Sequence, residues 1–229
     1  MQNQIQFKDY KCLYILSALY FMAIINSSVF ANRLILTPLG ILSGASIFSP
    51  VWLMLGDMIA EVYGYKMARH LFWIALFSEL IFCLISQGML YLPIPESWHG
   101  SDTYQLMTDH LVRFALLDLL AITIAWRINI HLLIKWKILL KGRYFWLRSL
   151  GSSGIGSIIY TLIGVTLCVV GVYPLHEVIS IVAWAIATKM IGLIILSPIG
   201  QLIVVYLKRI EAPLENNYLA SFNPFKKAG

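Results

Sequence analysis

A run of 23 residues that carry no charge, Leu34 to Gly56, constrains the fold of this chain more than any other feature. At about 1.5 Å per residue, a helix of that length crosses the roughly 30 Å hydrocarbon core of a bilayer. Two carboxylates, Asp57 and Glu61, follow at positions i and i+4, so a continuing helix carries both on one face. Carboxylates at such a depth are costly unless they meet water, a cation or a polar ligand. The segment therefore predicts a membrane-spanning helix with an acidic pair at its end.

The composition extends this prediction to the whole chain. Of its 229 residues, 59% are hydrophobic and only 12% are charged, whereas soluble domains have about 25% charged residues. We therefore expect an all-α integral membrane protein embedded in the lipid bilayer. The net charge of +6 would suggest nucleic acid binding in a soluble protein. Because the basic residues cluster in loops, they indicate membrane topology instead, and we expect no nucleic-acid partner.

Apolar runs predict six transmembrane helices. The expected spans are Cys12–Ala31, Leu34–Glu61, Leu71–Leu92, Leu111–Ile134, Ser149–Tyr173 and Val178–Leu207. They make residues 1–210 one six-helix transmembrane domain, and residues 211–229 are expected to form a short cytoplasmic tail. The last run is longer than 25 residues and contains Pro198, so we expect a tilt or a kink there.

The distribution of Lys and Arg predicts the orientation. One set of loops and chain ends is basic, through Lys8, Lys11, Lys66, Arg69, Lys135, Lys137, Lys141, Arg143, Arg148, Lys208, Arg209, Lys226 and Lys227. The loops on the other side hold Glu96, Asp102, Asp109 and Glu177, and only Arg33 lies at that edge. Because basic loops stay in the cytoplasm, we expect both termini there.

A small set of ionisable residues remains inside the predicted spans: Asp57, Glu61, Glu79, Arg113, Asp118, Arg127 and Lys189. Each costs on the order of 2.5–3.5 kcal/mol at mid-helix, so each should face the bundle interior or water. Structural ion pairs remain an open alternative for the residues near the span ends. Glu79, Asp118 and Lys189 lie deeper and predict a polar path, in which Asp118 and Lys189 are candidate partners. Arg113 has Asp109 four residues before it, so a local ion pair competes with ligand contact.

Small residues from Gly151 to Ser157 open the fifth predicted span. They fit close helix packing. The alternative is a helix start whose Ser152, Ser153 and Ser157 donate hydrogen bonds to a ligand. Trp126 lies among polar neighbours, where a flat heterocycle would stack on it, although packing is the default role of such a ring.

No catalytic or metal-binding pattern accompanies these polar residues. The three cysteines, at positions 12, 83 and 168, lie in separate apolar runs without a pairing pattern. The sequence also lacks a recognisable catalytic triad, a metal motif and a phosphate-binding glycine loop. We therefore expect no enzymatic activity, no cofactor, no metal and no ATPase site within this chain.

The stretch from Pro50 to Gly64 contains the pattern Asp-x-x-x-Glu-Val-Tyr-Gly at its end. It resembles the signature of the queuosine precursor transporters, six-helix bacterial inner-membrane proteins in the vitamin-uptake-transporter group. Further residues that fall in the family's order and spacing are Ala31, Asn32, Arg33, Leu34, Lys66, Ala68, Arg69, Arg113, Trp146, Arg148, Ser152, Ser153, Thr161, Lys189, Ser197 and Pro198. The resemblance covers all six predicted spans. It implies inner-membrane import of 7-cyano- or 7-aminomethyl-7-deazaguanine, of queuine, or of a related purine-like metabolite for tRNA queuosine salvage.

The chain departs from this family at several polar positions. Trp126 and Asn129 stand where the family usually carries Gln and Asp, and Ser157 and Tyr160 stand at a second such pair. Asp118 replaces a small hydroxyl residue. Two acids are lost and one is gained, so the resemblance predicts a rebuilt binding pocket.

Topology and resemblance together give a candidate substrate-binding set: Asn32, Asp57, Glu61, Glu79, Arg113, Asp118, Trp126, Asn129, Arg148, Ser153 and Lys189. Asp57 and Glu61 are expected at the cytoplasmic end, as a gate or as a brace against Arg148, and Asp57 is expected to be the one that reaches a ligand. The pocket itself is expected deeper, near Glu79, Asp118 and Lys189. The alternative function is a substrate-binding membrane subunit that needs a separate ATPase module. The oligomeric state stays open, a homo-oligomer included.

Overall fold

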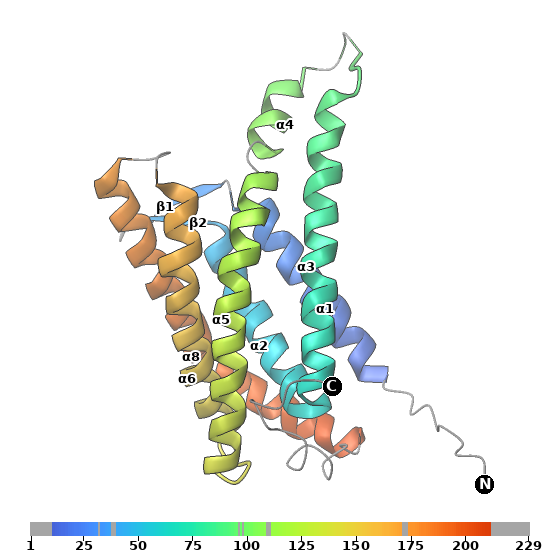
Figure 1. Cartoon of the computed structure of the whole chain (residues 1–229), viewed down its shortest axis with the longest axis vertical. Coiled ribbons are helices and arrows are strands. Elements are labelled where there is room, and N and C mark those ends of the chain that lie inside the picture. The colour runs from blue at the N-terminus through green and yellow to red at the C-terminus, as the bar shows by residue number, and fades with distance from the viewer. Residues whose placement is uncertain are drawn as a thin grey trace, which may run out of the picture.

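The chain folds into a bundle of long helices with one small β-hairpin (Figure 1). A computed structural model describes residues 11–31, 33–37, 40–95, 97, 99–108, 111–170 and 174–211. The long helices are α1 (Lys11–Val29), α2 (Ala45–Tyr63), α3 (Tyr65–Gly88), α5 (Leu111–Leu139), α6 (Phe145–Tyr160) and α8 (Leu175–Ile210). The shorter elements are β1 (Leu34–Thr37), β2 (Gly40–Ser43), η1 (Met89–Tyr91), α4 (Ser101–Thr108), the π-helix η2 (Thr161–Val165) and α7 (Thr166–Val169).

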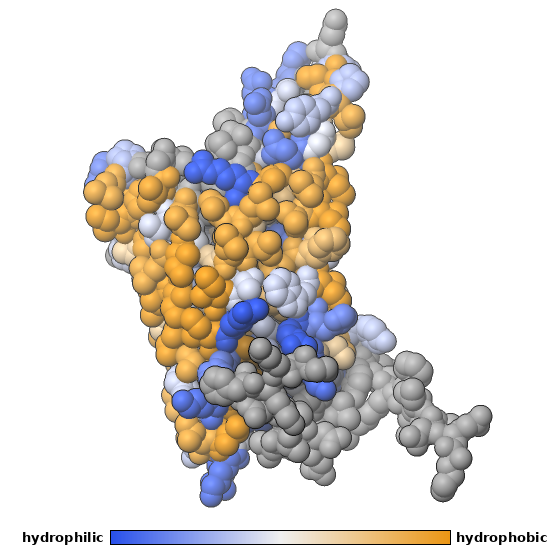
Figure 2. Space-filling model, viewed as in Figure 1, coloured by the Kyte–Doolittle hydropathy of each residue, from blue (hydrophilic) through white to orange (hydrophobic). Residues whose placement is uncertain are grey.

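Helix length and composition support the expected class of membrane protein. Within the described ranges, four helical stretches are long and apolar enough to cross a bilayer: Cys12–Val29, Ala45–Tyr63, Tyr65–Tyr91 and Leu175–Ile210. Figure 2 shows a broad hydrophobic band on one face of the molecule, with hydrophilic residues toward both ends. Helices α5 and α6 pack against each other, and α6 also packs against α8. The chain is therefore a multi-pass helical membrane protein.

The prediction that Leu34 to Glu61 forms one helix is wrong. Residues Leu34–Thr37 pair antiparallel with Gly40–Ser43, and α2 begins only at Ala45. Thr37 precedes a proline in the sequence, a position where the helical conformation is disfavoured. Gly40 has φ +150°, which side chains rarely allow, and a Cβ there would lie 1.8 Å from Nε1 of Trp184 in α8. The apolar run therefore begins as a hairpin that packs on α8, and only its second part is helical.

Several predicted helix boundaries also change. α3 begins at Tyr65, directly after Gly64. The φ of 87° at Gly64 interrupts the helix, so this single residue separates α2 from α3. Lys66 and Arg69 therefore lie in the first turns of α3 and not in a loop. Lys135 and Lys137 likewise lie inside α5, which runs to Leu139.

The last two predicted spans and the polar segment before α5 differ in detail. The fifth span begins four residues earlier than expected, so Arg148 lies within α6 and is fully buried. It continues through η2 and α7, and the end expected at Tyr173 lies outside the described residues. α8 is one helix that passes through Pro198. The polar segment before α5, expected to be a loop, contains helix α4.

Helix α2 lies at the centre of the bundle, where it packs against α1, α3, α6 and α8. Every residue from Trp52 to Tyr63 except Gly56 is buried, including both of its carboxylates. Its apolar side chains join Phe72 of α3 and Trp126 of α5 in one continuous core. The acidic pair therefore lies inside the protein, where its partners must come from neighbouring helices.

Candidate substrate site

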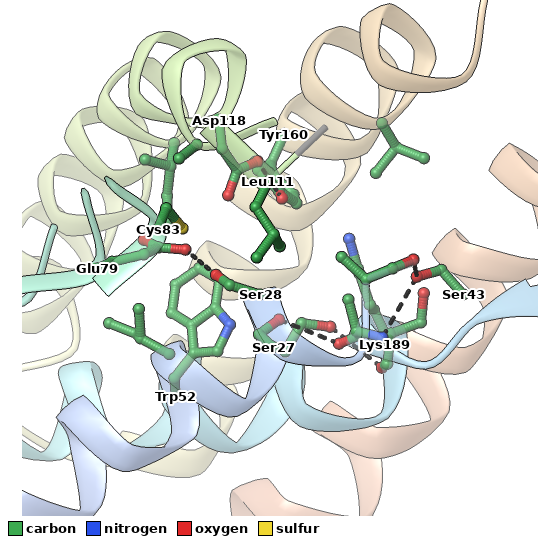
Figure 3. Close-up of a pocket in the computed structure, with 18 of the residues that line it drawn as sticks. Ser27, Ser28, Ser43, Trp52, Glu79, Cys83, Leu111, Asp118, Tyr160 and Lys189 are labelled. Atoms are coloured by element: carbon green, nitrogen blue, oxygen red, sulfur yellow. Dashed lines mark hydrogen bonds between the residues drawn. The ribbon is translucent and has the colours of Figure 1, made fainter. Parts of the chain in front are cut away.

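A cavity lies between the hairpin end of the bundle and the middle of α2 (Figure 3). The volume of this cavity is about 120 Å³. One water molecule needs only ~10–15 Å³ by the same measure. Residues of α1, α2, α3, α5, α6, η2, α8 and the hairpin line the cavity. Its polar lining consists of Ser27, Ser28, Ser43, Ser46, Ser49, Glu79, Asp118, Tyr160 and Lys189, and Trp52 adds an indole ring. All three deep ionisable residues that the sequence predicted to form a polar path therefore meet here.

Glu79 of α3 lies on one side of this cavity. It is 6% exposed, and its Oε1 accepts a hydrogen bond from the hydroxyl of Ser28 in α1. No Lys, Arg or His nitrogen of the described residues lies within 4.0 Å of its carboxylate. Figure 3 shows this bond beside Trp52 and Cys83. Within the described part of the chain, this buried carboxylate is thus held by a neutral partner.

Asp118, Tyr160 and Lys189 form a second polar group on the cavity wall. The hydroxyl of Tyr160 donates to Oδ1 of Asp118. The ammonium of Lys189 lies 4.4 Å from the centre of the same tyrosine ring and donates to Thr161 Oγ1 at 2.9 Å. Asp118 and Lys189, the candidate partners, form no direct ion pair within 4.0 Å, although their charges interact across the tyrosine. The tyrosine instead contacts both charges.

The π-helix η2 starts immediately after Tyr160, and its first residue, Thr161, accepts the hydrogen bond from Lys189. Single π turns are rare in proteins as a whole, but where they occur they often lie at functional sites. Gly164 allows η2 to approach α5 closely, because a Cβ at that position would lie 2.9 Å from Cβ of Ala121 and 3.2 Å from the ring of Tyr160. Local backbone geometry therefore fixes the residue that contacts both charges.

A much smaller cavity of about 10 Å³ adjoins the first. The two share Ser49, Trp52, Ile122, Tyr160 and Lys189, and the smaller one reaches Asn129, Trp126 and Ser157. Asn129 is 3% exposed, and its Oδ1 has no hydrogen-bond partner within the described part of the chain. The smaller cavity thus reaches Asn129, whose amide binds Asp57.

Asp57 is enclosed by hydrogen-bond donors from two helices. Its Oδ1 accepts from Asn129 Nδ2 at 3.1 Å, and its Oδ2 accepts from Ser149 and Ser153 hydroxyls, each at 2.6 Å. The residue is 1% exposed and does not line the main cavity. The expectation that Asp57 reaches a ligand more readily than Glu61 finds no support in this geometry. Asp57 instead joins α2 to α5 and α6.

Glu61 lies one turn further along α2 and meets three basic side chains. Arg148 Nη1 is 3.2 Å from its Oε2, and Lys208 and Lys137 lie 2.7 and 3.4 Å from its Oε1. These bases belong to α6, α8 and α5. Arg148 also donates to the backbone carbonyls of Arg143 and Gly142. The structure thus contains the expected brace between Glu61 and Arg148, and extends it to four helices.

Arg113 and Trp126 do not line the main cavity. Arg113 is exposed, and Asn32 and Asp109 lie outside the described residues. Trp126 stacks on Phe72 at a centroid distance of 4.3 Å and on Tyr65 at 6.0 Å, as expected of a packing residue. Close packing is confirmed for the small-residue run, since a Cβ on Gly156 would lie 3.0 Å from Cβ of Asn129.

Sequence reasoning missed some residues of both polar groups. Ser28 and Trp52 line the main cavity, but nothing in their local sequence marks them as different from other membrane residues. Ser149, by contrast, lies four residues before Ser153, and both hydroxyls bind Asp57. That i, i+4 spacing places the two serines on one helix face and was a usable signal.

The comparisons with known proteins agree with this architecture. Residues 43–203 match the family described as "putative vitamin uptake transporter". A protein of Bacillus subtilis (strain 168) named "probable queuosine precursor transporter" is 27% identical over 142 residues, which cover 60% of this chain and 62% of that relative. The match therefore spans less than two thirds of the relative's length. No solved structure matches the chain.

The family match covers well over half of the chain and confirms the resemblance seen at the Asp57–Gly64 signature. The family's printed description is that of a transporter and not of an enzyme. The buried acidic pair, the polar cavity in an apolar bundle and this match lead to one conclusion. The chain belongs to the family described as "putative vitamin uptake transporter".

Proposed function

We propose that this protein imports a queuosine precursor, or a related purine-like metabolite, across the bacterial inner membrane. The candidate substrates are 7-cyano- and 7-aminomethyl-7-deazaguanine and queuine. The relative's printed name supports this substrate class. Transport proceeds without nucleotide hydrolysis by this chain.

The chemistry of the main cavity is the observation that carries the proposal. A purine-like base has two flat faces and an edge of hydrogen-bond donors and acceptors. Trp52 and Tyr160 offer aromatic faces, Glu79 and Asp118 offer acceptors, and Lys189 and the lining serines offer donors. Few polar groups in a largely apolar cavity are typical of sites that bind small molecules.

The transport domain in this proposal has six crossings, with α5 and α6 added to the four apolar stretches. The basic start of α3 and the basic ends of α5 and α8 lie on the cytoplasmic side, as the positive-inside rule requires. The main cavity then faces outward, and the Asp57 and Glu61 clusters close the inner side. Single cysteines in the hairpin and in the α5–α6 turn test this orientation: a membrane-impermeant maleimide should label the first but not the second in intact cells.

Rescue of queuosine synthesis tests the substrate. The protein is expressed in a strain that cannot make queuosine, each deazapurine is supplied, and the modified base in tRNA is measured. We expect rescue by the native chain and loss of rescue in Asp118→Ala, because the cavity loses an acceptor. Glu177→Gln, on the other end of the molecule from the Glu61 cluster, is the matched control. Absence of rescue with every deazapurine contradicts the substrate.

Reconstitution separates this function from a binding subunit. Purified protein in liposomes should take up the base without ATP or a second protein. Uptake that appears only when an ATPase module is added would assign the chain to the alternative class.

A further inference from the structure

The charged groups of the main cavity do not balance. Among the described residues that line it, two are acidic and one is basic: Glu79, Asp118 and Lys189. Lys189 is 2% exposed and Glu79 is 6% exposed, so bulk water screens neither group well. If all three are ionised, the cavity carries one uncompensated negative charge.

That charge can be assigned to one residue. Tyr160 donates its hydroxyl to Asp118 while its ring lies 4.4 Å from the ammonium of Lys189. Asp118 and Lys189 thus contact the same tyrosine, and their opposite charges compensate each other. Glu79 is left on the other side of the cavity with the hydroxyl of Ser28 as its protein partner.

Glu61 shows how this chain treats a carboxylate that is compensated by its own residues. It is 5% exposed, comparable with Glu79, yet three basic side chains lie within 4.0 Å of it. A buried carboxylate is strongly unfavourable as an ion until a cation compensates it. The missing counterion of Glu79 therefore has a place in the cavity, where an open volume of about 120 Å³ adjoins the carboxylate.

We propose that the cavity selects a monocationic heterocycle and places its ammonium group against Glu79. This inference rests on the proposed function and narrows it: the amine-bearing deazapurine is the preferred substrate, and its neutral nitrile counterpart binds poorly. Trp52, on the same side of the cavity, supplies an aromatic face that favours a cation and a flat ring together. Glu79 is thus the specificity-determining residue.

Equilibrium binding to the full-length protein in detergent tests this selectivity. Tritiated 7-aminomethyl-7-deazaguanine is the probe, and unlabelled 7-cyano-7-deazaguanine competes with it. We expect the amine to bind roughly ten- to a hundred-fold more tightly, the range of a charge-assisted hydrogen bond in a buried site. Glu79→Gln should reduce this preference to within about threefold, while Glu79→Asp should retain it. Glu177→Gln should leave both affinities unchanged, and size-exclusion profiles check that every variant is folded.

Each outcome decides a separate point. Equal affinity for amine and nitrile in the native protein overturns the cation selectivity but leaves the proposed function standing. An unchanged preference in a folded Glu79→Gln variant overturns the role of Glu79. Binding of neither base, in a protein that is monodisperse, contradicts the proposed function itself. If Glu79→Gln does not fold, the comparison of native protein with Glu79→Asp decides, because a shorter acid that abolishes the preference would also contradict the assignment.

Discussion

Asp57 is surrounded by three hydrogen-bond donors. The effect of replacing it on stability depends on how many of these donors keep an acceptor. The donors are the amide of Asn129 and the hydroxyls of Ser149 and Ser153. A buried donor that loses its acceptor costs about 1–3 kcal/mol. The residue thus matters first as an acceptor and only second as a charge.

Asp57→Ala should therefore destabilise the protein by roughly 3 kcal/mol or more, since three donors lose their acceptor. Asp57→Asn should cost only about 1 kcal/mol, because its Oδ1 still accepts from the serines and its new amide can donate to the unpartnered Oδ1 of Asn129. Thermal unfolding in detergent measures the difference, with Ser17→Ala as a control whose hydroxyl bonds only within α1. Equal destabilisation by Ala and Asn would show that the charge itself is required.

The ion cluster around Glu61 acts at the scale of helices, because it joins α2 to α5, α6 and α8. Within this cluster, the pair between Glu61 and Arg148 is the most buried, because the side chain of Arg148 is 0% exposed. Removing one partner of a buried pair leaves the other charge uncompensated, which typically costs 3–5 kcal/mol.

Glu61→Gln should accordingly destabilise the bundle by about 3–5 kcal/mol. The double variant Glu61→Gln/Arg148→Met should recover part of this loss, since no buried charge is left over. Unfolding midpoints of the two variants and of Glu177→Gln, an acid at the opposite end, give the comparison. A double variant less stable than Glu61→Gln alone would show that the arginine's bonds to the backbone carbonyls matter more than the ion pair.

The contact between the hairpin and α8 depends on Gly40. Both its φ of +150° and its distance from the ring of Trp184 exclude a side chain. Gly40→Ala should lower the unfolding temperature and reduce transport, because the hairpin lines the main cavity through Leu34 and Ser43. Gly88→Ala is the matched control: nothing lies within 4 Å of its Cβ position, and its φ is −62°. We expect this control to be neutral or slightly stabilising, by up to about 1 kcal/mol.

At the scale of the whole molecule, the proposed cation selectivity has consequences for the driving force. Glu79 belongs to the protein, so the charge that crosses the membrane is that of the substrate. A membrane potential that is negative inside then drives accumulation directly, at about 2.3 kcal/mol per charge for 100 mV. Under the proposed selectivity, the potential alone is then expected to drive uptake of such a cation.

Proteoliposomes with an imposed potassium-diffusion potential of about 100 mV should therefore accumulate 7-aminomethyl-7-deazaguanine roughly 50-fold. Collapsing the potential should bring the inside and outside concentrations to equality. 7-cyano-7-deazaguanine, which is neutral, should reach equal concentrations under both conditions. Accumulation of the amine at zero potential would contradict uptake driven by the potential alone.

The sequence by itself determined that this protein lies in a lipid bilayer and that it is built from helices. Charge-free runs indicated membrane helices, and the Asp57–Gly64 signature indicated the family, because hydropathy and local motifs are properties of the chain alone. Glu79, Asp118 and Lys189 were identified as a polar group for the same reason: each is costly wherever the helix places it in a bilayer.

Only the tertiary structure decided which groups meet. Ser28 and Glu79 are separated by 51 residues, and Tyr160 and Asp118 by 42. The pairing of such distant side chains depends on the rotation and depth at which helices pack, and periodicity along one helix does not specify either. The hairpin at Leu34–Ser43 has the same origin, since its glycine was needed for contact with Trp184 of α8. The charge-free run from Leu34 to Gly56 is therefore a strand pair followed by a helix. Residues of both parts line the main cavity.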